Sequence, residues 1–313
     1  MRAAVTGGSG FIGSHVIDAL IAAGHDVVSL DPRRPHRPDA AHAPADIRDL
    51  PSLIEATAGC NVIFHLAAVA DVNDVARDPV GAIELNVGGT ANVLEAARRN
   101  GVKRVVLAST VWVYSSAAAP ENAVVDEATP FAVDANRHVY TSSKLAAEML
   151  CHDCWNAYQV PFTVLRYGIP YGPRMRPALV IPIFVRKALA GEALTVAGDG
   201  SQHRKFVYVE DLARAHVLAL DEKAANQTYN VDGTEKITIL QIAETVLHLT
   251  GSERPIEFMP ARGGDYAGRE VSSEKARREL GWQPEINFEE GMRRTVPWII
   301  DSLAEGAELS ARS

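Results

Sequence analysis

The first half of the chain alternates short apolar runs with longer amphipathic segments. The apolar runs predict buried strands at Ala3–Thr6, Val27–Leu30, Val62–Leu66, Val105–Leu107 and Phe162–Tyr167. Apolar positions at helical spacing predict helices at Phe11–Ala23, Leu50–Ala58, Ile83–Asn100 and Tyr140–Tyr158. Because strands and helices alternate and the strands are apolar throughout, we expect an α/β fold with a doubly wound parallel sheet.

The pattern changes after Arg166, where prolines and glycines become frequent. This composition is typical of a smaller, loop-rich α/β lobe with turns between short elements. We expect a first domain over residues 1–166, with parts of 206–230 rejoining it. The lobe would then comprise 167–205 and 231–303, and residues 304–313 read as a polar tail that frays.

Composition and charge narrow the classes of partner. The 313 residues carry a net charge of -8, which disfavours nucleic acid as a partner. Cys60, Cys151 and Cys154 are too few for a disulfide framework, and no second Cys or His pair lies near the CHDC run at 151–154, so we expect reduced, packed thiols and no metal. No signal peptide and no apolar run long enough to span a bilayer are visible, so we expect a cytoplasmic protein without a membrane partner.

A glycine-rich run follows the first predicted strand and opens the first helix. Gly7, Gly10 and Gly13 allow a tight turn, and with Phe11 and Ile12 they bring backbone N–H groups to the N-terminus of that helix. Such a turn holds a pyrophosphate in a dinucleotide-binding Rossmann domain.

Acidic residues downstream refine this cofactor prediction. Asp31 follows Gly13 by 18 residues at the end of the second strand, where a carboxylate accepts hydrogen bonds from both adenosine ribose hydroxyls and favours NAD over NADP. Arg33, Arg34 and Arg37 follow closely and could meet a 2′-phosphate, which leaves NADP open. Asp46 and Ile47 lie where the third strand should end and are predicted to flank the adenine.

A Tyr and a Lys lie one helical turn apart in the run YTSSK, at Tyr140 and Lys144. An ammonium beside a phenol favours the phenolate, lowering the Tyr pKa from its reference value of about 10. Tyr140 is therefore a candidate general base at neutral pH.

The chain resembles the extended short-chain dehydrogenase/reductases, and within them the nucleotide-sugar epimerase/dehydratase group. The runs that carry the resemblance are TGGSGFIG, HLAA at 65–68, LNVGGT at 85–90, STVWVY at 109–114, YTSSK, RYGIPYGP and GDGSQHRKFVYVEDLA. It extends from residue 1 to about residue 298, through LGWQPEINFEEGM. The resemblance implies NAD as cofactor and a nucleotide sugar, most often a UDP-sugar, as substrate.

The resemblance also implies roles for individual residues. Thr110 would hydrogen-bond the reacting hydroxyl with Ser109 beside it, Tyr140 would take the proton, and Lys144 would hold the nicotinamide ribose. Further residues at the cofactor would be Leu66, Ala67, Ala68, Asn86 and Tyr167. Residues at the nucleotide sugar would be Thr195, Arg204, Arg262 and Asp265.

Two positions bear on the reaction. Members of the group that dehydrate the sugar carry an Asp-Glu pair directly after the threonine, and related decarboxylases carry a Glu. This chain has Val111 and Trp112 there. The resemblance therefore implies hydride removal and return at C4, as in a UDP-sugar 4-epimerase.

The sugar itself stays open between a neutral hexose and a hexuronate. Arg176 stands where uronate epimerases of the group have an arginine near the carboxylate, whereas Ile169 replaces an Asn that glucose epimerases use. A 4-ketoreductase of deoxysugar biosynthesis and a non-catalytic dinucleotide-binding regulator are the alternative functions. Relatives commonly dimerise through the helices equivalent to Ile83–Asn100 and Tyr140–Tyr158, so a homodimer is expected.

Overall fold

The computed structural model describes residues 1–120, 122–135, 138–260 and 269–312, with side chains as far as residue 305. The chain divides into two compact units. Unit 1 comprises Met1–Gly168, Leu212–Asp232 and Arg269–Gln283, and unit 2 comprises Ile169–Asp211, Gly233–Gly268 and Pro284–Ser313.

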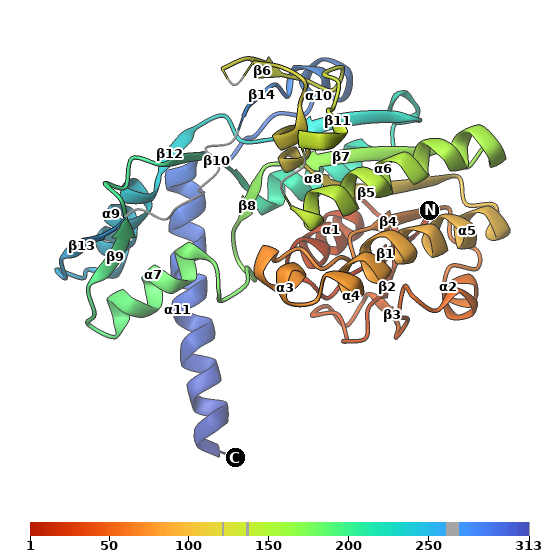
Figure 1. Ribbon diagram of the computed structural model, residues 1–313. Coiled ribbons are helices and arrows are strands. Elements are labelled where there is room, and N and C mark those ends of the chain that lie inside the picture. Colours follow the sequence, from red (N-terminus) through yellow and green to blue (C-terminus); the bar gives the residue numbers. More distant parts are fainter. Residues whose placement is uncertain (121, 136–137, 261–268, 313) are drawn as a thin grey trace. The chain divides into compact units, whose positions relative to one another are not determined.

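Unit 1 is built on a seven-stranded sheet in the order β11-β7-β5-β4-β1-β2-β3 (Figure 1). Its strands are β1 (Arg2–Thr6), β2 (Asp26–Leu30), β3 (Ala41–Ala43), β4 (Val62–His65), β5 (Arg104–Thr110), β7 (Phe162–Tyr167) and β11 (Gln227–Val231). Every pair of neighbours is parallel, and the order runs outward from β1 in both directions. The predicted doubly wound parallel sheet is confirmed.

Helices cover this sheet. They are α1 (Phe11–Ala22), α2 (Leu50–Ala56), α3 (Val72–Arg77), α4 (Pro79–Ile83), α5 (Gly89–Asn100), α6 (Val139–Tyr158) and α10 (Glu274–Leu280), and α8 (Val209–Leu218) enters unit 1 at Leu212. Short 3₁₀ turns lie at Val111–Ser116, Val133–Ala135 and Glu222–Ala224.

Both faces of the sheet are buried, as a parallel sheet between helices requires. Ile63 of β4 packs in a core with Leu53, Val93 and Ala147 of α2, α5 and α6. The next residue, Phe64, points to the other face, where its ring lies 5.8 Å from the ring of His216 on α8. This alternation explains why the strands read as apolar throughout.

The segment predicted as one helix over Ile83–Asn100 is interrupted. α4 ends at Ile83, a π-helical turn spans Glu84–Gly88, and α5 begins at Gly89. A π turn inserts one extra residue per turn and is typical of functional sites. Here it carries Asn86, whose amide is fully used in the site described below.

Unit 2 contains a three-stranded sheet and a two-stranded sheet. β10 (His203–Tyr208) pairs with β8 (Ile169–Tyr171) and β12 (Lys236–Thr238), and β9 (Leu194–Ala197) pairs with β13 (Ile256–Met259). Its helices are α7 (Val180–Leu189), α9 (Ile239–Thr250) and α11 (Phe288–Arg312), which pack on one another.

The two units differ in detail from the expected domain boundaries. Residues 269–283 belong to unit 1 rather than to the lobe, because β14 (Glu270–Val271) pairs with β6 (Val124–Val125). Val207 and Tyr208 stay with unit 2 because they pair with β8. The expected fraying tail is the last part of α11, which continues to Arg312.

Candidate active site

The glycine-rich turn between β1 and α1 leaves no room for side chains. Gly7 has a φ of 69°, and a Cβ added there would lie 2.8 Å from the backbone nitrogen of Ala67. A Cβ on Gly13 would overlap the carbonyl oxygen of Gly7. Both glycines are therefore required for α1 to pack closely against the end of the sheet.

The N-terminus of α1 suits an anionic ligand. Gly10 is the N-cap and supplies no side-chain cap, and Phe11 and Ile12 begin the helix half-buried. The first N–H groups of a helix have no partner within the helix and carry partial positive charge. These residues fit the pyrophosphate of a dinucleotide.

Asp31 lies beside this turn at the end of β2. It is 5% exposed, its Oδ2 accepts a hydrogen bond of 3.2 Å from the Ser9 backbone, and its Oδ1 accepts one of 3.0 Å from the Arg33 backbone. The Arg33 side chain is mostly exposed and approaches Asp31 at 3.4 Å. The carboxylate is thus held next to the phosphate-binding turn, as a ribose-binding acid should be.

The predicted adenine-flanking pair lies beyond β3, which ends at Ala43 and not at Asp46 as expected. Asp46 pairs with Arg48 at 2.6 Å, and the hydrogen bonds from Arg48 lower the pKa of Asp46. Ile47 is buried, and its side chain fills the space in front of Gly89.

A chain of buried hydrogen bonds starts at Thr6, the last residue of β1, directly before the glycine-rich turn. The backbone N–H groups of Leu66 and Ala67 donate to the Thr6 hydroxyl at 3.2 Å, and this hydroxyl lies 2.8 Å from Nδ1 of His65. On the other side of the ring, Nε2 lies 2.9 Å from the hydroxyl of Thr90, which itself donates to the carbonyl of Asn86. Nε2 therefore carries the proton, and Nδ1 accepts from Thr6.

This chain of hydrogen bonds continues to α6, the helix that carries the predicted residues Tyr140 and Lys144. The Asn86 amide bonds both backbone groups of Val69, at 2.8 Å and 3.0 Å, which fixes the loop after Ala68. The same amide donates to the Ser143 hydroxyl at 3.0 Å, and Ser143 donates to the Tyr140 carbonyl at 2.7 Å. Sequence reasoning named Asn86 but missed His65, for which the HLAA run was the available signal.

The three predicted catalytic residues lie on β5 and α6. Tyr140 is half-buried in the first turn of α6, and Lys144 is buried one turn later, donating from Nζ to the Ala108 carbonyl at 2.9 Å. Thr110 ends β5, and its hydroxyl accepts from the Trp112 backbone at 3.2 Å. β5 thus carries both the Thr110 hydroxyl, predicted to bind the substrate, and the Ala108 carbonyl, which accepts a hydrogen bond from Lys144.

Burial dominates the electrostatics of these groups. It lowers the pKa of Lys144 to about 8, although Glu148 acts in the opposite direction. Burial, and then the nearby Lys144, lower the pKa of His65 to about 3, so the ring is neutral. Burial and Glu148 thus act in opposite directions on the protonation of Lys144, and a pKa of about 8 still leaves it mainly an ammonium at neutral pH.

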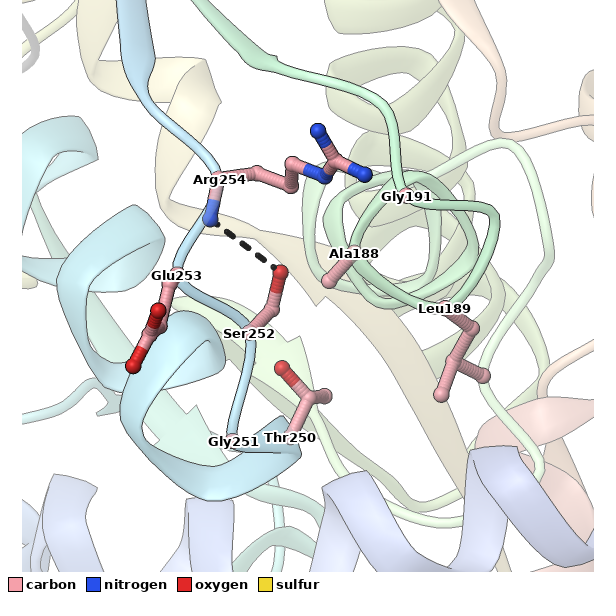
Figure 2. A pocket seen from close by; sticks show the side chains of 8 residues that line it. All are labelled: Ala188, Leu189, Gly191, Thr250, Gly251, Ser252, Glu253 and Arg254. Atoms are coloured by element: carbon pink, nitrogen blue, oxygen red, sulfur yellow. Dashed lines mark hydrogen bonds between the residues drawn. The ribbon is translucent and has the colours of Figure 1, made fainter.

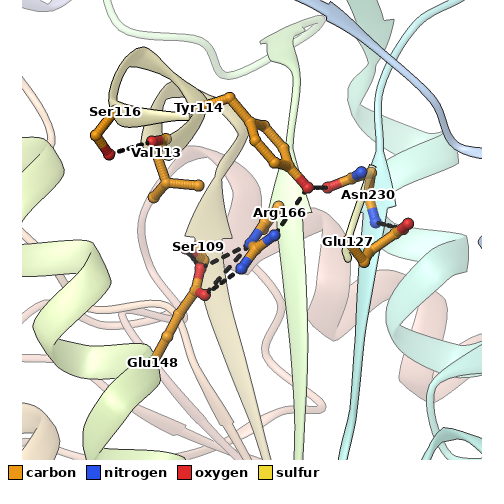
Figure 3. Close-up of polar contacts among 8 residues, drawn as sticks. All are labelled: Ser109, Val113, Tyr114, Ser116, Glu127, Glu148, Arg166 and Asn230. Atoms are coloured by element: carbon orange, nitrogen blue, oxygen red, sulfur yellow. Dashed lines mark hydrogen bonds and ion pairs between the residues drawn. The ribbon is translucent and has the colours of Figure 1, made fainter. Parts of the chain in front are cut away.

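Figure 3 shows a second polar network in unit 1. The Ser109 hydroxyl donates to Glu148 at 2.5 Å, Glu148 pairs with Arg166, and Arg166 donates to the Tyr114 hydroxyl at 2.8 Å. Tyr114 in turn donates to Asn230 at 2.9 Å. Glu148, Arg166 and Tyr114 were not predicted as site residues, and the Ser109 hydroxyl is directed to Glu148.

Tyr167 is buried, and its hydroxyl lies 2.5 Å from Nε2 of His216. Burial raises the pKa of this phenol well above its ordinary value, so it stays protonated. Its predicted contact with the cofactor stays a prediction.

The residues predicted for the nucleotide sugar lie in unit 2. Arg176 is exposed in the loop before α7, Thr195 of β9 accepts from Lys187 at 2.9 Å, and Arg204 of β10 donates to the His203 carbonyl at 2.8 Å. Arg262 and Asp265 lie outside the described residues.

A shallow depression on unit 2, shown in Figure 2, includes none of the predicted residues. It lies between the end of α7 and the loop after α9, and it is lined by Ala188, Leu189, Gly191, Thr250, Gly251, Ser252, Glu253 and Arg254.

The residues that the structure describes show neither a metal-binding cluster nor a membrane-spanning helix. In the described part of the chain, no three His, Cys, Asp or Glu side chains gather as metal ligands. Burial raises the pKa of the thiols of Cys60, Cys151 and Cys154. Within the described ranges, no helix is long and apolar enough to cross a membrane.

Comparison with known proteins gives a consistent match. The model of the NAD dependent epimerase/dehydratase family matches residues 3–232. A UDP-glucose 4-epimerase of Mycolicibacterium smegmatis is 34% identical, covering 96% of this chain and 98% of its own. A UDP-N-acetyl-alpha-D-glucosaminuronate decarboxylase of Bacillus cytotoxicus is 32% identical, covering 95% and 97%.

A solved structure agrees. The UDP-glucose 4-epimerase of Thermus thermophilus in complex with NAD is 33% identical, with a TM-score of 0.85, and the match covers 96% of this chain and 99% of that one. Relatives of nearly equal similarity thus carry different reactions, so overall similarity does not select between them.

Proposed function

Because the chain belongs to the NAD-dependent epimerase/dehydratase family, we propose that it inverts C4 of a UDP-sugar. The cofactor is NAD. The substrate pair is UDP-glucose and UDP-galactose, or UDP-glucuronate and UDP-galacturonate. The family contains dehydratases and decarboxylases as well, so the proposal depends on what this chain places beside Thr110.

The observation that carries the proposal is the pair Val111 and Trp112. They follow Thr110 at the start of the 3₁₀ turn Val111–Ser116, and both are half-buried. The family resemblance implies that dehydratases of the group have Asp and Glu at these two places and that decarboxylases have Glu. Neither an isopropyl group nor an indole can donate a proton, so dehydration lacks the acid for its leaving hydroxyl, and decarboxylation lacks the acid that assists its later chemistry.

The cofactor half of the site supports the proposal by its shape and charge. Gly7 and Gly13 let the turn and α1 pack closely against the end of the sheet, and the N-terminus of α1 has no side-chain cap, so its N–H groups could bind a pyrophosphate. Asp31 is held for the adenosine ribose, and Lys144 for the nicotinamide ribose. When bound, NAD supplies the hydride acceptor and donor that inversion requires.

The residues of unit 1 then have distinct tasks. Tyr140 takes the proton of the C4 hydroxyl and later returns it to the 4-keto sugar. Thr110 hydrogen-bonds the same oxygen, and the Lys144 ammonium stabilises the phenolate of Tyr140. Inversion follows when the keto sugar presents its other face before reduction.

Unit 2 is proposed to bind the nucleotide sugar. Arg204 and Arg262 would contact the diphosphate, since guanidinium groups suit phosphate oxygens. Asp265 would bind the nucleotide ribose, and Thr195 lies on the strand proposed to run beside the base. Arg176 would contact a C6 carboxylate, which would favour a hexuronate.

The test is proton NMR of the anomeric region after incubation with UDP-glucose and, separately, with UDP-glucuronate. We expect new signals of the matching C4 epimer in at least one sample, without added reduced cofactor. Turnover that requires a reduced cofactor would indicate a 4-ketoreductase instead. No change in either sample would contradict the proposed substrates.

Tyr140→Phe is the matched variant for the proton transfer. It removes one hydroxyl, so we expect turnover to fall at least about a thousandfold while NAD stays bound. Turnover near that of the wild type would contradict the assignment of Tyr140 as the base.

We also propose a homodimer formed through α6 and the α4–α5 segment. Met149 and Tyr158 of α6 and Val80 of α4 are 65%, 60% and 68% exposed. Apolar side chains this exposed on neighbouring helices fit a helical interface. Sedimentation velocity of the wild type and of Met149→Glu measures it directly; we expect the variant to shift toward the monomer.

A further inference from the structure

Glu148 occupies a position next to the proposed catalytic lysine. It lies four residues after Lys144 on α6, so both side chains lie on one face of the helix, and they are 5% and 6% exposed. Arg166 of β7 donates two hydrogen bonds to its carboxylate, from Nη2 to Oε2 at 2.7 Å and from Nε to Oε1 at 3.1 Å (Figure 3). A buried carboxylate and guanidinium in this geometry form a strongly directional pair.

Glu148 joins α6 to two strands: Arg166 lies on β7, and Ser109 lies on β5, the strand that carries Thr110. The hydroxyl of Ser109 donates to Glu148, and Nζ of Lys144 donates to the carbonyl of Ala108. Two successive turns of α6 are therefore held on two successive residues of β5. The next residue of that strand is Thr110, so its position relative to α6 is set by these contacts.

Arg166 is itself held on its other side. It lies opposite Ser109 in the β5–β7 register, and its guanidinium carbon is 5.1 Å from the ring centres of both Tyr114 and Phe131. Burial opposes its charge, but the hydrogen bonds that it donates to Glu148, and the attraction of that carboxylate, prevail and raise the pKa of Arg166. Arg166 is thus a permanent cation with one fixed orientation.

We propose that Glu148 and Arg166 form a positioning pair for the reaction: the pair fixes α6 on the end of β5, and Glu148 supplies the negative charge that keeps Lys144 an ammonium. The inference rests on the proposed role of Lys144. Neither Glu148 nor Arg166 needs to touch the substrate.

The charges around Lys144 support this role. His65 of β4 is neutral, Tyr140 lies one turn earlier on α6, and Arg166 of β7 adds a positive charge beyond Glu148. Glu148 is the group that raises the pKa of Lys144 against burial. Without this carboxylate, a buried lysine favours its neutral form and stabilises a phenolate less.

The experiment follows Lys144 directly, by titrating its ε-carbon resonance in protein labelled with [ε-¹³C]lysine and loaded with NAD; Lys144→Met assigns the signal. We expect Glu148→Gln to lower the titration midpoint by about one pH unit or more, a tenfold loss of proton affinity. Arg166→Gln leaves Glu148 without its cationic partner and should raise the midpoint. A purely structural role predicts no such opposite shifts.

Glu95→Gln is the matched control, because Glu95 pairs with Arg98 and Arg99 on the surface of α5, away from Lys144. It should leave the Lys144 midpoint unchanged. If either single variant does not fold, Glu148→Gln/Arg166→Gln removes both buried charges together, and it should still lower the midpoint. Midpoints within about 0.3 units of the wild type in the folded variants would overturn the proposal.

Activity provides the second readout. At neutral pH we expect Glu148→Gln to lower kcat at least about tenfold with little change in KM, because positioning and charge act on the chemical step. The titration requires no turnover, so the two proposals fail separately. A shifted Lys144 with no epimerisation contradicts only the substrate proposal, and epimerisation with an unshifted Lys144 contradicts only the positioning pair.

Discussion

The residues proposed for the cofactor in unit 1 and those proposed for the substrate in unit 2 are held in different ways. In unit 1, a Cβ added at Gly7 or Gly13 would collide with backbone atoms. His65 and Lys144 are buried, and both have hydrogen-bond partners. In unit 2, Arg176 and Thr195 are exposed. The proposed cofactor site is therefore part of the packing of unit 1, whereas the proposed substrate residues of unit 2 are side chains that can change without disturbing the core.

The largest effect is expected at Gly13. Gly13→Val places a branched side chain against the Gly7 carbonyl, so α1 must move, at about 1–3 kcal/mol of stability. We expect the purified variant to retain no NAD, measured by release of nucleotide on denaturation.

Gly88→Val is the control for that variant, because nothing lies within 4 Å of a Cβ added at Gly88. It should keep NAD at the wild-type level. NAD retained by Gly13→Val would show that the turn tolerates movement and that the contrast between the two units is overstated.

Arg204→Ala tests the other side of the comparison. A lost charge-assisted hydrogen bond is worth about 1.5–3 kcal/mol, so KM for the UDP-sugar should rise about ten- to a hundredfold. The NAD content and the urea midpoint should not change. Arg254→Ala, an exposed arginine of the same unit, should leave KM unchanged, and an equal rise in both variants would argue for a general charge effect.

Features that depend on residues close together in the chain could be predicted from the sequence, whereas contacts between distant segments could not. The strands, the glycine turn and the Tyr140–Lys144 pair were found because each depends on neighbours within one or two turns of chain. The β14–β6 pairing was missed because its partners are more than a hundred residues apart and only two residues long. The π turn at Glu84–Gly88 was missed because one inserted residue hardly alters a helical pattern.

The polar networks behind the site were missed for a related reason. Glu148 follows Lys144 at helical spacing, but its partner Arg166 comes from β7 and Ser109 from β5. Nothing local marks a strand arginine as buried, since most arginines are exposed. Only the parallel register of β5 and β7, which sets Ser109 opposite Arg166, brings them together.

A smaller expected effect, the loss of stability in acid, also differs between the two units. His65 and His216 are buried in unit 1, and burial lowers their pKa values to about 3 and about 4. Below the unfolded value of about 6.5 the unfolded chain binds protons that the folded chain does not, so stability falls as pH drops toward 4. At pH 5 each histidine should cost about 2 kcal/mol relative to pH 7.5.

Urea unfolding at both pH values measures this loss. His65→Asn should reduce it, whereas His203→Asn, at an exposed position of unit 2, should leave it unchanged. A loss that His65→Asn does not alter would place the acid sensitivity elsewhere.

The central claim is that hydrogen leaves C4 of the sugar and returns to the same carbon. The most direct measurement uses the UDP-sugar labelled with deuterium at C4, followed by NMR and mass analysis of both epimers. The account predicts that the product epimer retains deuterium at C4 and that reaction in D₂O introduces none there. Loss of the C4 label, or entry of solvent deuterium at C4, would contradict it.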